Sequence, residues 1–244
     1  MRRFFLDGPL AASMAIRGQD ARHIGKVLRL KTGDEIAVVA KDGQAGRAVI
    51  TAVGPTSVSL DLVEALAISC EPPVAVWLAQ GLPKGDKFEY IIQKAVEIGA
   101  AGIIPLATDF SAVQYDEVRQ RSRLVRWRKV AEEAAKQCGR TALPTVTEVK
   151  SLAEVLAGAA DGTAAIMLYE GQTGGSLQAA LDADPASAYL LLVGPEGGFS
   201  KAEADLVQAR GGRLAGLGPR ILRTETASLV GLTIIMHQKG DLGN

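Results

Sequence analysis

Residues 189–200, YLLLVGPEGGFS, decide the fold, because a continuous apolar run leads directly into a glycine-rich turn. Such a run predicts a strand that is buried on both faces of a parallel sheet. In open α/β sheets, ligands bind where the strands end and the chain turns. Glycine lacks a Cβ, so the backbone of residues 194–198 can approach a ligand closely. This turn is therefore a candidate ligand-binding loop.

A second glycine-containing turn lies in residues 217–227, LGPRILRTETA, and an apolar helix follows it. Neither turn matches the GxGxxG fingerprint or the P-loop. Glu196 also places a negative charge where a phosphate needs a positive field. A ligand with a positive centre and an adenine or ribose edge suits these loops better. The alternative is that the first turn only connects a strand to a helix, with Ser200 as the helix cap.

Together the two turns resemble those of the RsmE family, SPOUT-class methyltransferases that methylate N3 of a uridine in 16S ribosomal RNA. Residues 88–99 (FEYIIQKAVEIG) and 126–140 (RWRKVAEEAAKQCGR) resemble two further signatures of that family. The resemblance implies a trefoil-knotted SPOUT α/β domain that binds S-adenosylmethionine, and a homodimer. The sequence departs from the family at residues 96–99 and at residues 108–111, where the family more often has Glu-Arg-Ser. The second departure leaves the role of the Thr108 loop open.

On this resemblance, cofactor contacts are expected from both turns and from a third loop that follows the apolar stretch 164–169. The expected cofactor-binding residues are Leu168, Tyr169, Glu170, Gly194, Pro195, Glu196, Gly197, Gly198, Leu217, Gly218, Ile221, Leu222, Arg223, Thr226 and Ala227.

Methylation of uridine N3 requires loss of a proton and stabilisation of the negative charge on the ring carbonyls. Arg220 and Arg223 flank the second turn and are the candidates for charge stabilisation. Glu225 is a candidate to accept the proton or to fix the turn by accepting backbone N–H groups, and we favour the second role.

Composition sets the class of protein. The 244 residues carry 27 Lys and Arg against 27 Asp and Glu, so net charge says nothing about a polyanionic partner. Cys70 and Cys138 are too far apart in sequence to suggest a metal site. The N-terminus lacks the apolar core of a signal peptide, and no run reaches membrane-span length. We expect a cytoplasmic protein that needs neither a metal nor a membrane.

Two domains are expected, with Pro72 and Pro73 at the boundary. Residues 1–71 read as a small β-barrel with one helix, and the resemblance implies a PUA-like RNA-binding barrel there. The elements expected in this part are strands at 3–6, 35–40, 45–53 and 57–63, and a helix at 20–30 capped by Asp20.

Residues 72–244 alternate strands and helices, which predicts α/β structure. The elements expected in this SPOUT methyltransferase domain are strands at 74–79, 103–106, 164–169, 189–193 and 213–216, and helices at 84–99, 119–140, 152–157, 177–181, 201–209 and 226–238.

Basic residues are the candidate contacts for RNA phosphates, with 16S ribosomal RNA in the small subunit as the expected partner. The candidates are Arg2, Arg3, Arg22, Lys26, Arg29, Lys84, Arg126 and Arg140. An ordinary solvated surface is the alternative for all of them. Trp127 has helical spacing with apolar neighbours and is expected in the core.

Two other functions stay open from the sequence. One is a SPOUT-class methyltransferase that acts on another RNA nucleotide, and the other is a ribosome-assembly factor that binds RNA without catalysis. Cofactor binding distinguishes the enzyme from the binding protein. A nicotinamide dehydrogenase is disfavoured, because no GxGxxG motif opens the α/β region.

Overall fold

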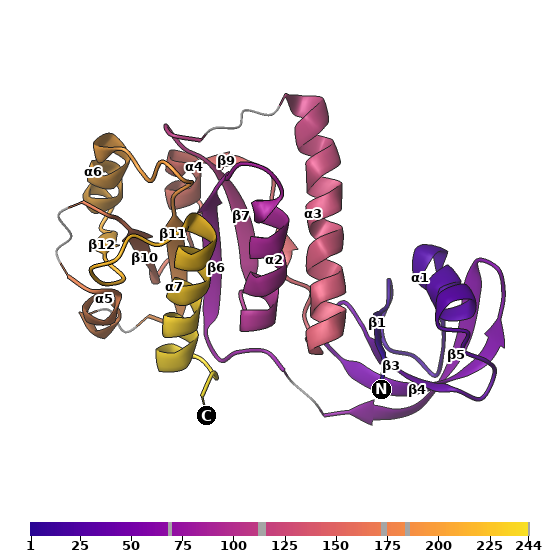
Figure 1. The fold of residues 1–244 in the computed structure, drawn as a ribbon. Coiled ribbons are helices and arrows are strands. Elements are labelled where there is room, and N and C mark those ends of the chain that lie inside the picture. The colour runs from indigo at the N-terminus through magenta and orange to yellow at the C-terminus, as the bar shows by residue number, and fades with distance from the viewer. Residues whose placement is uncertain (68–69, 112–115, 172–174, 184–185, 244) are drawn as a thin grey trace. The chain divides into compact units, whose positions relative to one another are not determined.

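The structure is a computed structural model that describes residues 1–67, 70–111, 116–171, 175–183 and 186–243. The chain divides into two compact units (Figure 1). The first comprises Met1–Glu71 and Ala135–Leu143, and the second comprises Pro72–Ala134 and Pro144–Asn244.

The first unit is a curled five-stranded sheet with the order β1-β3-β4-β5-β2. Strand β1 pairs with β3 in parallel, and the other neighbours are antiparallel. Its elements are β1 (Arg3–Phe5), β2 (Ser13–Arg17), α1 (Gly18–Arg22), the π-helical turn η1 (His23–Val27), β3 (Glu35–Val39), β4 (Ala45–Val53) and β5 (Ser57–Leu66). Alternate strand residues face a core that Ala21 and Ile24 cover from the helical segment. The sheet is a half-barrel and not a closed barrel, because β1 and β2 are its edges in the described residues.

One expectation for this unit is wrong, because Asp20 does not cap a helix, and strand β2 is an element that the sequence patterns do not predict. The helical segment begins at Gly18, and its N-cap residue Arg17 makes no side-chain cap bond. Asp20 lies inside α1, where its carboxylate accepts a hydrogen bond from Lys136 Nζ at 2.8 Å.

Arg140 is a further correction, because it is not a surface residue available to RNA. It is only 5% exposed, and its Nε and Nη2 donate to Glu71 Oε2 at 3.0 and 2.5 Å. The other oxygen of Glu71 accepts the backbone N–H groups of Thr141 and Ala142, both at 2.8 Å. We call Glu71 and residues 140–142 the Glu71 clamp. The clamp joins the two chain segments of the first unit, Met1–Glu71 and Ala135–Leu143.

The second unit contains a parallel sheet with the order β12-β10-β11-β6-β7-β8, and β9 also pairs with β7. Its strands are β6 (Ala75–Gly81), β7 (Gly102–Ala107), β8 (Thr145–Val146), β9 (Lys150–Ser151), β10 (Thr163–Leu168), β11 (Ala188–Val193) and β12 (Arg213–Ala215). Strand β11 is buried from Tyr189 to Val193, so the predicted strand with two buried faces is confirmed.

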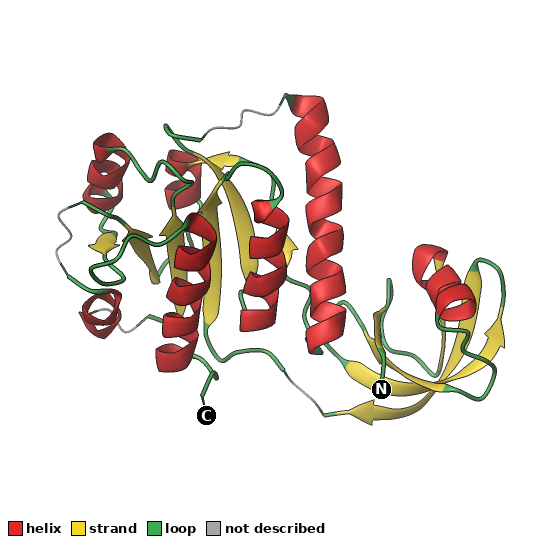
Figure 2. Cartoon of the chain, in the orientation of Figure 1, coloured by secondary structure: helices red, strands yellow, loops and turns green. Residues whose placement is uncertain are grey.

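Helices cover both faces of this sheet (Figure 2). The helices that follow residue 72 are α2 (Lys87–Ile98), α3 (Glu117–Cys138), α4 (Leu152–Ala157), α5 (Leu177–Ala183), α6 (Lys201–Ala209) and α7 (Thr224–Lys239), and the last residues of α3 belong to the first unit. Helices α4 and α6 share a core with one face. Helix α7 lies on the other face, where Gly231 meets Leu191, and α2 packs beside it. Trp127 of α3 is 1% exposed and packs against Phe88 of α2, with ring centroids 4.6 Å apart and ring planes tilted by 59°, so its core assignment is confirmed.

The start of one helix differs from the expected residue, and the expected cap of another helix is present. Helix α2 begins at Lys87 rather than residue 84, because Gly85 adopts a φ of +69°, which a right-handed helix excludes. Ser200 caps α6 in a capping box with Glu203, so the expected cap is confirmed. None of the described helices is long and apolar enough to cross a membrane.

Candidate cofactor site

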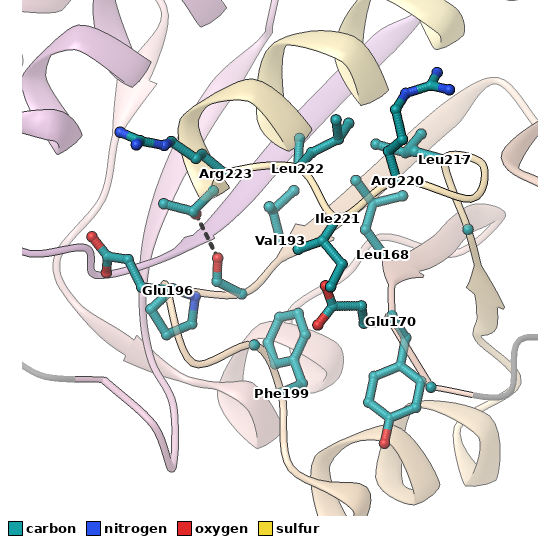
Figure 3. Close-up of a pocket in the computed structure, with 18 of the residues that line it drawn as sticks. Leu168, Glu170, Val193, Glu196, Phe199, Leu217, Arg220, Ile221, Leu222 and Arg223 are labelled. Atoms are coloured by element: carbon teal, nitrogen blue, oxygen red, sulfur yellow. Dashed lines mark hydrogen bonds between the residues drawn. The ribbon is translucent and has the colours of Figure 1, made fainter.

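Three neighbouring parallel strands end at one edge of the sheet, and the loops that follow them enclose a cavity. The strands are β12, β10 and β11, and the cavity has a volume of about 1010 Å³ (Figure 3). It is lined by Lys87, residues 168–171, 193–199 and 215–224, and Ala227. This is the position where open parallel sheets bind ligands. The volume accommodates a nucleoside with an attached amino acid.

Glycines give this cavity its shape. A Cβ on Gly194 would lie 2.8 Å from the carbonyl carbon of Gly198, so the first turn closes tightly on itself. A Cβ on Gly81, at the end of β6, would lie 2.4 Å from Pro195 Cδ. Gly198 and Gly218 instead have positive φ values, +70° and +108°, and open space where a Cβ would point. Backbone therefore lies directly against the space available to a ligand.

A buried polar network ties the two turns together beneath the cavity. Thr224 Oγ1 donates to the Gly194 carbonyl at 2.6 Å, and Gln80 Nε2 donates to Thr224 Oγ1 at 2.9 Å. Ser228 Oγ hydrogen-bonds to Gln80 Oε1. Gln80 and Ser228 are fully buried. Because separating these groups would leave buried polar atoms without partners, the network fixes one turn relative to the other.

Most of the expected cofactor residues line the cavity, and Thr226 is the exception. It is exposed in the first turn of α7 and lies outside the lining. The lining residues that the sequence reasoning missed are Lys87, Gly171, Val193, Phe199, Ala215, Gly216, Pro219 and Thr224. All except Lys87 adjoin the expected loops in sequence, so wider loop bounds would have included them. The sequence around Lys87 does not indicate a cofactor contact, because Lys87 belongs to α2 and is remote in sequence from the expected loops.

Lys87 occupies the cavity rim between two carboxylates. Its Nζ lies 2.8 Å from Glu196 Oε1 and 3.5 Å from Glu225 Oε2. The hydrogen bond to Glu196 raises the pKa of Lys87. Partial burial favours protonated Glu196, but hydrogen bonds from Lys87 Nζ and from the Glu196 and Lys84 N–H groups outweigh burial and lower the Glu196 pKa. Both groups are therefore charged at neutral pH.

Glu225 does not have the role that the sequence favours, because no backbone N–H group of the described residues donates to its carboxylate. The N-cap of α7 is Arg223, which makes no side-chain cap bond. Glu225 Oε2 is buried without a hydrogen-bond partner among the described residues, and its charged neighbour is Lys87. The carboxylate thus faces an ammonium group rather than the backbone of the turn.

Arg220 and Arg223 line the cavity with part of their side chains, but their guanidinium groups point away from it and from each other (Figure 3). Both are exposed, and neither makes an ion pair within the described part of the chain. Their charged ends are available to a ligand outside the cavity, such as a polyanion.

The lining fits S-adenosylmethionine. Leu168, Val193, Phe199 and Leu222 offer apolar surface to an adenine ring, and Glu170 points toward the cavity with a negative charge that suits a sulfonium or an ammonium group (Figure 3). The open space beside Gly218 lets backbone meet the ligand. In the described residues, no group of His, Cys, Asp or Glu could hold a metal ion.

The remaining candidate contacts for RNA have different surroundings. Those on the surface of the first unit are Arg2, Arg22, Lys26 and Arg29, and Arg29 has a φ of +53°, a conformation that few side chains adopt. Arg3 is half-buried. In the second unit, Lys84 is exposed, and Arg126 is 59% exposed with its Nη2 2.7 Å from Glu89 Oε2.

Two family models match the chain. An RNA methyltransferase domain matches residues 70–236, and an RNA methyltransferase PUA domain matches residues 16–63. Together these matches extend over both units.

Relatives and solved structures agree with these matches. The chain is 36% identical to ribosomal RNA small subunit methyltransferase E of Bacillus subtilis, over 98% of this chain and 97% of the relative. It is 30% identical to the protein of the same name from Mycobacterium bovis, over 91% and 85% of the two chains. The crystal structure of a ribosomal RNA small subunit methyltransferase E from Neisseria gonorrhoeae, bound to S-adenosyl methionine, superposes with a TM-score of 0.90 at 27% identity, over 99% of each chain.

Proposed function

The chain belongs to the ribosomal RNA small subunit methyltransferase E family, and from this premise we propose that it methylates N3 of a uridine in 16S ribosomal RNA. S-adenosylmethionine is the methyl donor, and the substrate is the small subunit or its RNA in the cytoplasm. The observation that carries the proposal is the cavity at the ends of β10, β11 and β12. Its glycine-shaped lining fits this cofactor.

The residues of the chain have three tasks in this reaction. The bound cofactor supplies an electrophilic methyl group. Gly194, Gly198 and Gly218 allow backbone to hold the cofactor, and the Gln80 network keeps the two turns in register. Fixed geometry of donor and acceptor alone lowers the barrier by several kcal/mol. Arg220 and Arg223 extend outward, and we assign them to the RNA backbone rather than to the reacting base.

The direct test is product analysis. Purified protein, S-adenosylmethionine and small subunits that lack the modification should give one methylated uridine, and mass spectrometry of its nucleosides should identify 3-methyluridine. A methyl group on another base or on a ribose would contradict the proposed acceptor. Cofactor binding without any transfer to RNA would favour the assembly factor instead.

The first unit is the proposed RNA-binding module, and Arg22 and Lys26 on its helical segment are its test residues. The double change Arg22→Gln and Lys26→Gln should weaken RNA binding and reduce the slope of log K against log salt by about 1.4 to 1.8, if each residue neutralises one phosphate. Filter binding across a salt series measures this slope. The control is Lys129→Gln with Lys201→Gln, which removes the same charge from exposed sites in the second unit. An unchanged slope in the Arg22 and Lys26 variant would identify ordinary solvated surface.

We also propose a homodimer, supported by the face formed by α5 and α7. A second cavity of about 520 Å³ lies there, and the apolar residues of its lining are Leu177, Leu217 and Ile234. Leu229 and Val230 of α7 are also only partly buried within one chain. Ile234→Glu should therefore convert a dimer into a monomer, because it places a charge in a desolvated interface. Multi-angle light scattering measures the mass, and a wild-type monomer at every concentration would contradict the proposal.

A further inference from the structure

The cavity has three cationic residues in its lining, and among these three Lys87 alone forms an ion pair within the described part of the chain. Arg220 and Arg223 point away from the cavity, whereas Lys87 Nζ is held by Glu196 at 2.8 Å. Lys87 comes from the first turn of α2, and its side chain is 35% exposed. Lys87 therefore differs from an ordinary surface lysine in that an ion pair holds its ammonium group in one place, while part of the side chain stays accessible.

The surroundings of Lys87 leave it a free donor. An ammonium group has three N–H donors. One is used by Glu196, and Glu225 Oε2 lies 3.5 Å away and occupies at most one more. The other nearby acidic residues, Asp86 before α2 and Glu89 within it, pair with arginines of α3. Arg123 lies 4.0 Å from Asp86, and Arg126 lies 2.7 Å from Glu89. Lys87 therefore retains at least one N–H donor, and the residue belongs to the lining of the cavity.

We propose that Lys87 is a catalytic residue that donates a hydrogen bond to a carbonyl oxygen of the target uracil and stabilises its N3 anion. This inference rests on the proposed function. Glu196 and Glu225 are positioning residues, because their carboxylates hold the ammonium group from the loop after β11 and from α7. The acceptor nitrogen loses its proton to solvent and forms the N–C bond as the C–S bond breaks, with the bonding pair left on sulfur.

The electrostatics suit this role. Uracil carries its negative charge on the two carbonyl oxygens as well as on N3, so a cation beside one oxygen favours the deprotonated ring. The raised pKa of Lys87 keeps the group protonated at the alkaline pH that helps the uracil to ionise. A donor that is already in place needs no reorganisation when the charge appears, and removal of one such donor typically costs about 100-fold or more in rate.

The test uses the full chain, S-adenosylmethionine and small subunits in single-turnover experiments at several pH values. Lys87→Met should reduce the maximal rate by roughly 100-fold and move the rise of the rate to higher pH, whereas Lys87→Arg should recover much of the loss. The KM for the subunit and the calorimetric affinity for the cofactor should change little. Lys94→Met is the matched control, because Lys94 lies on the same helix, is 33% exposed and pairs with Glu97 at 2.8 Å.

Substrate chemistry gives an independent readout. A 5-fluorouridine at the target position has a more acidic N3, so the defect of Lys87→Met should shrink with this substrate. A defect confined to KM, with an unchanged pH profile and no rescue, would assign Lys87 to an RNA phosphate and overturn the proposal. If Lys87→Met does not fold, Lys87→Gln is subject to the same criteria. Absence of cofactor binding by the wild type, or a methyl group elsewhere, would instead contradict the proposed function.

Discussion

Replacing Gly194 by alanine should weaken the binding of S-adenosylmethionine by roughly 10- to 100-fold. The added Cβ would lie 2.8 Å from the carbonyl carbon and 2.9 Å from the Cα of Gly198. Both atoms belong to backbone, so the methyl group cannot be accommodated by rotation of a side chain. The turn itself must open, and overpacking of this kind costs about 1–3 kcal/mol. The cost falls on the loop that forms the wall of the cavity.

The matched control is Gly158→Ala at the C-terminus of α4. Its added Cβ would lie 3.2 Å from a backbone oxygen, a less severe approach in the same unit but outside the cavity. Isothermal titration calorimetry of both variants, with circular dichroism to verify folding, measures the effect. Wild-type affinity in folded Gly194→Ala protein would remove the first turn from the cofactor site.

Replacing Arg140 by methionine should destabilise the first unit by about 3 kcal/mol, because it leaves the Glu71 carboxylate partly buried without its cation. This is the lower end of the usual range for a broken buried pair. Glu71 keeps its two backbone N–H donors and is 23% exposed. Urea unfolding followed by far-UV circular dichroism detects the change. Both tryptophans, Trp77 and Trp127, lie in the second unit. Their fluorescence therefore follows the unfolding of the second unit, separately from that of the first.

In Arg140→Met, the free energy of unfolding should also depend less on pH between neutral and acidic conditions than it does in the wild type. Burial favours protonated Glu71, but hydrogen bonds from Arg140 and from the 141 and 142 amides outweigh it and lower the pKa of Glu71 below its ordinary value of 4.5. The stabilisation is complete above the unfolded pKa and is lost as the pH falls through the folded pKa. Wild-type protein should therefore lose stability below about pH 4.5, and Arg140→Met should lose less. Arg119→Met, at an exposed pair with Asp116, should change stability by at most about 0.5 kcal/mol.

Local sequence patterns predicted the elements well wherever the deciding interactions are local. The apolar run before Gly194 became a buried central strand, and Ser200 caps the next helix. Phe88, Ile91, Ile92, Ala95 and Val96 form the buried face of α2 at helical spacing. Such features depend on residues within one or two turns of the chain, so periodicity and capping chemistry reveal them.

The errors involve residues whose partners are distant in the sequence. Arg140 lies at the end of a basic helix and looks like surface, but its partner Glu71 is 69 positions away. Lys87 reaches the cavity only because β6, which precedes α2, pairs with β11, so α2 starts near the loop of Glu196. Gln80 contacts Ser228 across 148 positions. No spacing rule within one segment can reveal such a partner, because strand order and helix packing create the contact.

The Gln80 network also restrains one end of the second turn. The second turn is anchored at both ends, since Gly216 pairs with Gly175 and Leu177 through its backbone and Thr224 is held in the network. Only residues 217–223 lie between these anchors, and Ile221 among them is 81% exposed. Residues 217–223 therefore form a loop that is held at both ends by hydrogen bonds. We therefore expect that exchange of the ligand involves bending of residues 217–223, a loop motion of about nanoseconds to microseconds.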